Sequence, residues 1–438
     1  MSFKAKIEPV TRVEGHASVN IEIDKGKVKD VRMSIVESPR FFEYLLVGVS
    51  GEEAPRISQR ICGICFAAHS LSSVKAVESA WGVEPPEKAE QLRRLLHLGG
   101  VLSSHLLHLV YLATPDYLGD ERRFPCLNAS RPELFKTLIE MYGYSNSLTE
   151  TIGGRRIHVS TVVPGGMTKC VSKEQLDGLR KEASRMIGNA SNVAESLLEA
   201  FERGFKSFPV VPSFRIAMTS NGQSELYDGE VKVLNMHGEE EYSFKADEYM
   251  DNIAEKTVGY SYVKYPYLRK KGFPRGIYMT GCLPRMETAR GLKGENAEVL
   301  FEKYNSLFKP GKSLVAYNSA RAIEVVSILE QIQELMMEEV YGDLRIKVKP
   351  KKGVGVGLVE APRGILIHHY ETDSNGVITK ANIITPTTQN APAMERSIQT
   401  FVEDRIDDFA SPDSRDKVIK EVEKLIRCYD PCISCSVH

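Results

Sequence analysis

Two short motifs at opposite ends of the chain hold the residue types of a metal site. Cys62 and Cys65 are separated by two residues in RICGIC, and Cys432 and Cys435 repeat that spacing in DPCISC. Cysteine thiolates are soft ligands that suit zinc, copper(I), nickel or iron. Paired C-x-x-C motifs in a long chain indicate metal or redox chemistry. We therefore predict that these four cysteines bind metal.

The separation of the two motifs favours a catalytic centre over a structural zinc site. In zinc ribbons the two pairs follow each other within about 20 residues, whereas here most of the chain lies between them. A shared site would join the N-terminal region to the C-terminal segment through the interior. A structural zinc bound by four cysteines is the alternative. Arg60 is either a guanidinium that offsets the thiolate charge or a surface arginine.

The composition narrows the class of function. The chain has 438 residues, 42% of them hydrophobic and 26% charged, and a formal net charge of −1, so it has no electrostatic footprint for nucleic acid. No apolar run reaches the roughly 18 residues of a membrane span, and the N-terminus lacks a signal-peptide core. We expect a cytoplasmic protein without a membrane span. The other cysteines are expected to be small buried hydrophobic side chains: Cys126, Cys170, Cys282 and Cys428.

Hydrophobic periodicity predicts a mainly α fold of the α+β class: a central buried bundle of long helices with small β-hairpin and sheet additions, whose N- and C-terminal segments join at the metal site. Helices are predicted at 66–81, 87–114, 131–150, 173–205, 318–340 and 412–427. A hairpin is predicted at 17–37, and strands at 222–245 and 353–385. The chain is expected to form one unit, 1–438, with sub-regions 1–60, 61–205 together with 290–345, 206–289, and 346–438.

The cysteine motifs lie within a longer series of sequence boxes. RICGIC followed by His69, together with DPCISCSVH, resembles the paired signatures of the large subunit of nickel–iron hydrogenases. Five further boxes resemble that family in the same order: PVTRVEGH at 9–16, RFFEYLLVG at 40–48, SSHLLHLVYLATPDYLG at 103–119, EAPRGIL at 360–366 and ITPTTQNAP at 384–392. The resemblance therefore extends from residue 9 to residue 438.

The resemblance implies a nickel–iron cluster whose iron carries carbon monoxide and cyanide. Cys62 and Cys432 would be terminal nickel ligands, and Cys65 and Cys435 would bridge nickel and iron. H2 is a very weak acid that must be split heterolytically, so a soft metal would take the hydride while a base takes the proton. Cys432 would be the first base, and Glu14 in RVEGH would be the proton relay, as a buried carboxylic acid with a raised pKa.

Further residues gain roles from the same resemblance. Arg363 in EAPRG would lie over the open metal position, where it polarises H2 or acts as a base, with Asp430 as its partner. Pro386 and Thr387 would contact the cyanide ligands, and His69 would hydrogen-bond a cluster sulfur. We interpret the remaining histidines of the 103–119 box, His105 and His108, as core or supporting residues and not as ligands.

A second, harder metal is implied near the C-terminus. Glu43, His438 and the backbone carbonyl near Ile383 resemble its ligands, completed by water. Magnesium is the usual ion in the family, although a histidine ligand is unusual for magnesium, and another divalent metal is the alternative. Large subunits of this type lose a C-terminal extension after the final histidine, so we expect this sequence to represent the processed form.

The resemblance also implies partners. The chain has no second cysteine set for an iron–sulfur cluster, so electrons are expected to leave through an iron–sulfur small subunit. The short chain and the DPCISCSVH ending look most like archaeal methanogen enzymes that do not reduce deazaflavin and that feed heterodisulfide reductase, through a further electron-transfer subunit. Ser103–Ser104–His105 departs from some respiratory hydrogenases, which carry an aspartate near Ser104, and so argues against a respiratory assignment. The alternatives are a deazaflavin-reducing hydrogenase, a regulatory H2 sensor, a quinone-reductase subunit without cluster cysteines, and a zinc-stapled scaffold.

Overall fold

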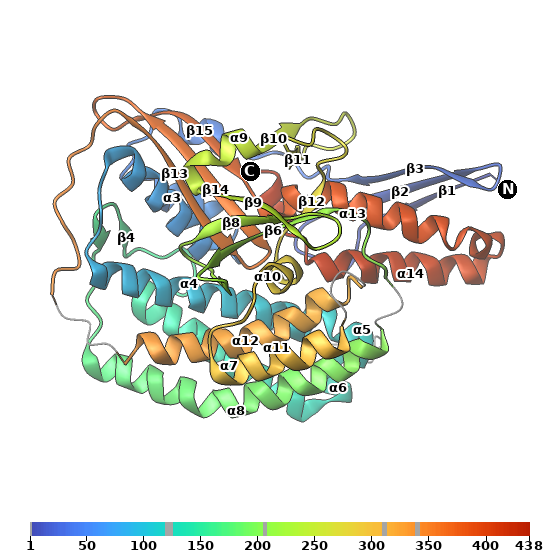
Figure 1. Ribbon diagram of the computed structural model, residues 1–438, viewed down its shortest axis with the longest axis horizontal. Helices are drawn as coiled ribbons and strands as arrows, with labels where there is room; N and C mark the ends of the chain where they lie inside the picture. The colour runs from blue at the N-terminus through green and yellow to red at the C-terminus, as the bar shows by residue number, and fades with distance from the viewer. Residues whose placement is uncertain (1, 119–125, 205–207, 309–312, 338–341) are drawn as a thin grey trace.

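The computed structural model describes residues 2–118, 126–204, 208–308, 313–337 and 342–438 (Figure 1). Long helices make up the lower half of the molecule in this view, and three small antiparallel or mixed sheets lie above and beside them. The C-terminus lies within the body of the molecule, whereas the N-terminus lies at one end. The fold is thus mainly helical with small sheets.

The long helices pack against one another to form the core. α12 packs against α8 and α4, and α4 packs against α7. α12 is buried on almost every side, and the charges of its Arg321 and Glu324 are paired inside the core. The main helices are α3 (Phe66–Trp81), α4 (Glu87–Leu107), α7 (Pro132–Gly153), α8 (Lys173–Arg203), α11 (Glu295–Leu307) and α12 (Ala316–Leu335).

Three sheets flank this core. The N-terminal sheet has the order β1 (Phe3–Ile7), β2 (Ser18–Asp24), β3 (Lys27–Ser34). The second has the order β12 (Tyr278–Met279), β6 (Phe214–Ser220), β8 (Glu230–Leu234), β9 (Glu240–Phe244), and β7 (Gln223–Ser224) pairs with β6. The third is the meander β13 (Gly353–Ala361), β14 (Gly364–Thr372), β15 (Ile378–Ile384). Two-stranded pairs form from β4 (Val162–Val163) with β5 (Gly166–Met167), and from β10 (Ile253–Lys256) with β11 (Tyr265–Leu268).

The shorter helices connect these layers. They are α1 (Phe42–Leu46), α2 (Ala54–Ser58), the 3-10 turn η1 (Gln59–Ile61), α5 (Pro115–Leu118), α6 (Cys126–Ser130), the 3-10 turn η3 (Ala246–Glu248), α9 (Tyr249–Asn252) and α10 (Cys282–Thr288). The C-terminal region consists of α13 (Pro386–Glu403), the 3-10 turn η4 (Ile406–Ala410), α14 (Pro412–Tyr429) and α15 (Ile433–Ser436).

The close packing of α3 on β13 fixes the position of the first cysteine motif. The strand begins with the sequence GVGVG, and the Ser72 hydroxyl donates to the Gly357 carbonyl at 2.8 Å. A Cβ atom at Gly357 would lie 1.9 Å from the Ser72 carbonyl oxygen. Only glycine therefore lets the helix approach the strand this closely.

Most predicted elements are confirmed, and the differences have local causes. The helix predicted to 114 ends at Leu107 and continues as a π-helical turn, His108–Ala113. Strand β1 was missed because its alternation is short. The prediction also missed α13, because ITPTTQNAP is rich in threonine and proline; Pro386 stands in the first turn of that helix, where its missing N–H has no intrahelical acceptor.

The expectation for the other cysteines is confirmed in part. Cys282 and Cys428 are fully buried. Cys170 is exposed, and the prediction for it was wrong, because it lies in the polar segment between β5 and α8. The side chain of Cys126 lies outside the described residues.

One described segment, Glu87–Leu118, is long and apolar enough to cross a membrane by length and composition, although the expectation was that no such run exists. The protein itself buries 78% of its most apolar window. Its hydrophobicity is therefore accounted for by its place in the core.

The buried histidine of α4 leads to a prediction about stability. Burial lowers the pKa of His97 to about 4, and its Nε2 atom contacts the Glu360 carbonyl at 2.9 Å. As the pH falls from about 6.5 to about 4, the unfolded chain gains a proton at His97 that the folded chain does not. The free energy of unfolding should fall by about 1.4 kcal/mol per pH unit from this group alone.

Chemical denaturation between pH 4 and 7 measures this dependence. His97→Gln should show a correspondingly shallower slope, because glutamine keeps an N–H for the carbonyl but does not titrate. His237→Gln, at an exposed histidine, is the matched control. An unchanged slope in His97→Gln would contradict the prediction.

Candidate metal centre

The fold brings the two cysteine motifs together, as the sequence predicts. Cys62 follows η1, Cys65 precedes α3, Cys432 precedes α15 and Cys435 lies within it. All four sulfur atoms lie within 4.8 Å of one another, and all four side chains are buried. The Sγ atoms of Cys62 and Cys432 are 3.3 Å apart, and those of Cys432 and Cys435 are 3.0 Å apart.

The charge state of this cluster indicates what it can hold. Hydrogen bonds from Cys432, Cys435 and Cys65 hold the pKa of the Cys62 thiol well below its usual range. Burial raises the pKa of the Cys432 and Cys435 thiols well above theirs. Four thiolates this close repel one another in a dry site. A multivalent metal would remove that penalty, so the donor set fits a soft metal centre.

Arg363 lies over the cluster. It is in the turn between β13 and β14, and its side chain is 2% exposed. Its Nη1 atom donates to Cys65 Sγ at 3.3 Å and to the Ser104 hydroxyl at 3.2 Å. Its Nε and Nη2 atoms donate to the backbone carbonyl and the carboxylate of Asp430, at 2.5 Å and 2.9 Å. The guanidinium therefore joins the sulfur cluster to a buried carboxylate.

Asp430 is held by three basic groups. It ends α14 in the left-handed conformation, with φ of 53°. Its Oδ1 atom lies 2.8 Å from His108 Nδ1, and its Oδ2 atom lies 3.8 Å from Arg321 Nη2. Burial acts to raise the pKa of Asp430, but Arg363, His108 and Arg321 outweigh it and hold the pKa well below the usual range. Asp430 is therefore the ionised partner of Arg363.

Glu14 contacts the cluster from the N-terminal side. Cys432 Sγ lies 3.2 Å from Glu14 Oε2, which also accepts a hydrogen bond from the Ser434 amide at 2.9 Å. The backbones of Glu14 and Cys432 form an isolated parallel bridge. The sequence predicts a buried carboxylate at Glu14. In the structure this side chain is only half-buried. Its direct contact with a sulfur atom is nevertheless the geometry of a proton acceptor.

Thr387 and His69 lie on other sides of the cluster. The Thr387 hydroxyl accepts the Cys432 amide at 2.9 Å, and both Thr387 and Pro386 are buried at the start of α13. His69 Nε2 lies 3.6 Å from Cys435 Sγ. Burial lowers the pKa of His69 to about 3, so this imidazole is neutral.

A second group of polar atoms surrounds the last residue of the chain. His438 Nε2 lies 2.7 Å from the Ile383 carbonyl and 3.7 Å from Glu43 Oε1. Glu43 also accepts the Ile383 amide at 2.8 Å, and Lys264 Nζ lies 3.7 Å from its other oxygen. Burial acts to raise the pKa of Glu43, but His438, Lys264 and the Ile383 amide together lower it. The three predicted residues therefore meet.

The structure also places the other arginine and histidines that the sequence brought into question. Arg60 is exposed and takes no part in the cluster. His105 and His108 are fully buried beside carboxylates. This agrees with their interpretation as core or supporting residues. His368 was not foreseen; its Nε2 atom contacts His69 Nδ1 at 3.1 Å. The alternating pattern GILIHHY places His368 and Tyr370 on one face of β14, which is the signal that was available.

Comparison with known proteins agrees with this geometry. The family model described as nickel-dependent hydrogenase matches residues 40–121 and 214–438, and a model described as HoxL-like matches residues 4–38. The chain belongs to the nickel-dependent hydrogenase family. It is accordingly the large component of a hydrogenase, an oxidoreductase that acts on H2. The quinone-reductase and zinc-scaffold alternatives are set aside.

Individual relatives cover nearly the whole chain. The matching chain of the vhu F420-non-reducing hydrogenase of Methanocaldococcus jannaschii is 40% identical over 409 residues, which is 90% of this chain and 98% of the relative. The alpha chain of sulfhydrogenase 2 from Pyrococcus furiosus is 35% identical and covers 99% and 98%. The crystal structure of an NAD+-reducing nickel–iron hydrogenase in its H2-reduced state superposes with a TM-score of 0.92 at 32% identity, over 100% of this chain and 99% of the other.

Proposed function

We propose that Cys62, Cys65, Cys432 and Cys435 hold a nickel–iron centre whose iron carries carbon monoxide and cyanide. Cys62 and Cys432 would be its terminal nickel ligands, and Cys65 and Cys435 would be shared between nickel and iron. The observation that supports this is the buried group of four sulfur atoms within 4.8 Å, in a chain of the nickel-dependent hydrogenase family. When bound, the centre would supply the electrophilic metal at which H2 is cleaved heterolytically into a hydride and a proton.

The protein residues then receive and remove the proton. Cys432 Sγ accepts it first, because this sulfur lies 3.2 Å from Glu14 Oε2, which takes the proton onward. Arg363 directs its guanidinium at the same site and is kept charged by Asp430. A fixed buried cation near the reacting bond stabilises developing negative charge more strongly than water would.

Two further residues hold the site. The Thr387 oxygen accepts the Cys432 amide, so its own O–H is available as a donor to a cyanide ligand, with Pro386 beside it. His69 supports Cys435 through the 3.6 Å contact of its Nε2 atom. A hydrogen bond to a ligating sulfur tunes its basicity.

A magnesium or other divalent ion is proposed beside the C-terminus. Glu43, His438 and the Ile383 carbonyl would be its protein ligands, completed by water. The site is supported by the His438 Nε2 atom, which lies 2.7 Å from the Ile383 carbonyl and 3.7 Å from Glu43 Oε1. This ion would fix the segment that follows Cys435.

Glu43→Gln should lower the content of this second metal while nickel is retained. An amide binds a hard divalent cation more weakly than a carboxylate does, and we expect about a tenfold to 100-fold loss of affinity. Metal analysis after dialysis against a chelator measures it. Glu53→Gln, at an exposed glutamate, is the control. Equal second-metal content in Glu43→Gln and the unmodified protein would contradict the assignment.

The chain is proposed to act with an iron–sulfur small subunit. The four-cysteine cluster is the one all-cysteine ligand group within the described ranges, so electrons need a partner. Phe41, Tyr44 and Leu45 at α1 are 62%, 79% and 52% exposed and form an apolar surface near Glu43 that suits docking.

We infer a single structural unit, 1–438, that is cytoplasmic.

The printed name of one relative suggests the electron acceptor. Because the Methanocaldococcus relative is named an F420-non-reducing hydrogenase, we infer that this chain does not serve deazaflavin reduction. Electrons would pass through a further electron-transfer subunit towards heterodisulfide reductase. Turnover of H2 with deazaflavin by the purified complex would contradict this inference.

An infrared spectrum of the purified complex tests the proposed centre. One carbonyl band and two cyanide bands are expected in the region where protein hardly absorbs. Cys62→Ser and Cys435→Ser should abolish all three bands, whereas Cys170→Ser, at an exposed cysteine, should leave them unchanged. A blank spectrum from nickel-loaded, unmodified complex would refute the iron fragment.

A further inference from the structure

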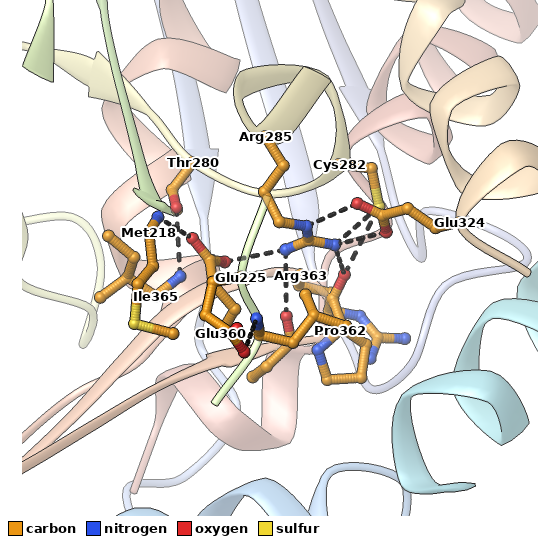
Figure 2. Close-up of polar contacts among 12 residues, drawn as sticks. Met218, Glu225, Thr280, Cys282, Arg285, Glu324, Glu360, Pro362, Arg363 and Ile365 are labelled. Carbon is orange, nitrogen blue, oxygen red and sulfur yellow. Dashed lines mark hydrogen bonds and ion pairs between the residues drawn. The ribbon is translucent and has the colours of Figure 1, made fainter. Parts of the chain in front are cut away.

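A second buried group of ionic side chains lies behind the turn that holds Arg363. Arg285 on α10, Glu324 on α12 and Glu360 at the end of β13 have fully or almost fully buried side chains. Figure 2 shows Arg285 between the two carboxylates, with Pro362 and Arg363 beside it. We call Arg285, Glu324 and Glu360 the Arg285 clamp.

All three nitrogens of the Arg285 guanidinium donate to carboxylate oxygens of the clamp. Its Nε and Nη2 atoms donate to the two oxygens of Glu324 at 2.6 Å and 2.7 Å. Its Nη1 atom donates to Glu360 Oε2 at 2.8 Å. A planar fork makes these contacts at once, whereas a lysine ammonium is a single point of charge.

The same guanidinium holds the backbone that leads to Arg363. Its Nη1 and Nη2 atoms lie 3.4 Å from the carbonyl oxygens of Ala361 and Pro362, the two residues before Arg363. The other carboxylate oxygen of Glu360 accepts the Met218 amide at 2.8 Å. Every residue from 360 to 362 is therefore fixed to the clamp or to β6.

The far side of the turn is fixed by the segment before α10. A Cβ atom at Gly281, whose φ is +108°, would lie 2.7 Å from the Arg363 carbonyl oxygen. The side-chain Nδ2 atom of Asn390 donates to the Thr280 carbonyl at 3.1 Å and lies 3.5 Å from the Arg363 carbonyl. Because α10 begins at Cys282, Arg285 and the Thr280–Gly281 segment that contacts the turn belong to one short stretch of chain.

The clamp is not a further metal site. His105, Cys282 and Glu324 have ligand-type atoms within 4.8 Å of one another. However, the Arg285 Nη2 atom already donates to Cys282 Sγ at 3.2 Å and to Glu324. A protein cation therefore occupies the position that a metal would need.

We propose that Arg285, Glu324 and Glu360 are positioning residues that set the Ala361–Arg363 backbone and thereby aim the Arg363 guanidinium at Cys65 and Asp430. The effect of this positioning on H2 turnover rests on the proposed function, whereas its effect on the backbone geometry does not. The Arg363 fork must reach a sulfur and a carboxylate together, and a shift of about 1 Å in such a group costs about 100-fold in rate.

Arg285→Lys tests the clamp, and Arg93→Lys is its matched control. Arg93 is equally buried, pairs with Glu78 at 2.7 Å and 2.9 Å, and also donates to two backbone carbonyls, those of Val163 and Gly166. These contacts lie away from the Arg363 turn. Both variants should lower the melting temperature, so loss of stability alone does not distinguish them.

Three other measurements do distinguish them. In Arg285→Lys, hydrogen exchange of the backbone amides of Ala361 and of 363–366 should accelerate about tenfold, because lysine cannot keep the buried hydrogen bonds that hold this backbone closed. H2 turnover by the complex should fall about 10- to 100-fold with nickel retained. The infrared carbonyl band should shift. Arg93→Lys should leave all three unchanged.

The outcomes separate the clamp from the proposed function. Unchanged exchange and unchanged turnover in Arg285→Lys, or equal changes in Arg93→Lys, would overturn the clamp. If Arg285→Lys yields no folded protein, Glu324→Gln, which removes one charge and keeps the shape, decides by the same measurements. Absence of carbonyl and cyanide bands in the unmodified complex would overturn the proposed function, and the exchange measurement would still judge the clamp.

Discussion

Glu14→Gln should reduce the exchange of protons between H2 and solvent by about 100- to 10,000-fold, the usual contribution of a positioned acid–base group. The glutamine oxygen can still accept the Ser434 amide, which lies 2.9 Å from the carboxylate in the unmodified protein. Its amide group cannot accept the proton of Cys432 and release it. Structure should therefore be retained while proton movement is lost.

Formation of HD from H2 in heavy water measures this step without an electron acceptor. Glu37→Gln is the matched control, because Glu37 accepts the His16 amide of the same loop at 3.0 Å and lies outside the cysteine cluster. Nickel content and the infrared bands should be unchanged in both variants. Loss of nickel from Glu14→Gln would show that this carboxylate supports the cluster and does not relay protons.

The cysteine cluster could be predicted from the sequence because its signal is local. Each C-x-x-C pair places two thiolates on one turn. This local spacing indicates metal binding without any knowledge of the tertiary structure. That the two pairs meet was an inference from their shared type, and the structure supports it with sulfur atoms 3.3 Å apart across Cys62 and Cys432. Arg363 and Glu14 were predicted from the resemblance of their boxes, and Asp430 was predicted as the partner of Arg363 because it precedes the second cysteine pair and must face the same cluster.

The supports of the site could not be read in the same way. Arg285, Glu324 and Glu360 lie on three separate elements, α10, α12 and β13, and nothing in their spacing indicates that they meet. Glu324 stands in a helix predicted from its apolar periodicity, where a glutamate looks like an exposed residue. Tertiary packing alone pairs it with Arg285. Buried ionic networks of this kind are satisfied over long sequence distances.

Glu14 illustrates a difference of degree. The sequence predicted a buried acid, but its side chain is half-buried in the described chain. It stands at the surface where the N-terminal bridge meets the C-terminal segment. A carboxylate in that position can take a proton from Cys432 on one side and pass it to solvent or to a partner on the other. Its partial exposure is thus compatible with a relay.

Arg363→Lys should lower H2 turnover by about 100- to 1,000-fold, the loss typical when a preorganised donor is removed from a reacting site. The arginine fork makes four contacts: one to Cys65, one to Ser104 and two to Asp430. A lysine nitrogen cannot satisfy a sulfur and a carboxylate in these two directions together. Its charge would nevertheless remain beside Asp430, so folding and nickel loading should survive.

Arg363→Met makes the complementary test, because it removes the charge. Asp430 would keep only His108 at 2.8 Å and Arg321 at 3.8 Å, and breaking a buried pair in this way destabilises a protein by about 3–5 kcal/mol. Arg363→Lys should therefore be slow but stable, and Arg363→Met slow and unstable. Arg215→Lys, which alters a buried pair with Glu287 at 2.8 Å, controls for the cost of the substitution itself. Full turnover in Arg363→Lys would mean that the charge alone, without the fork, is what the site requires.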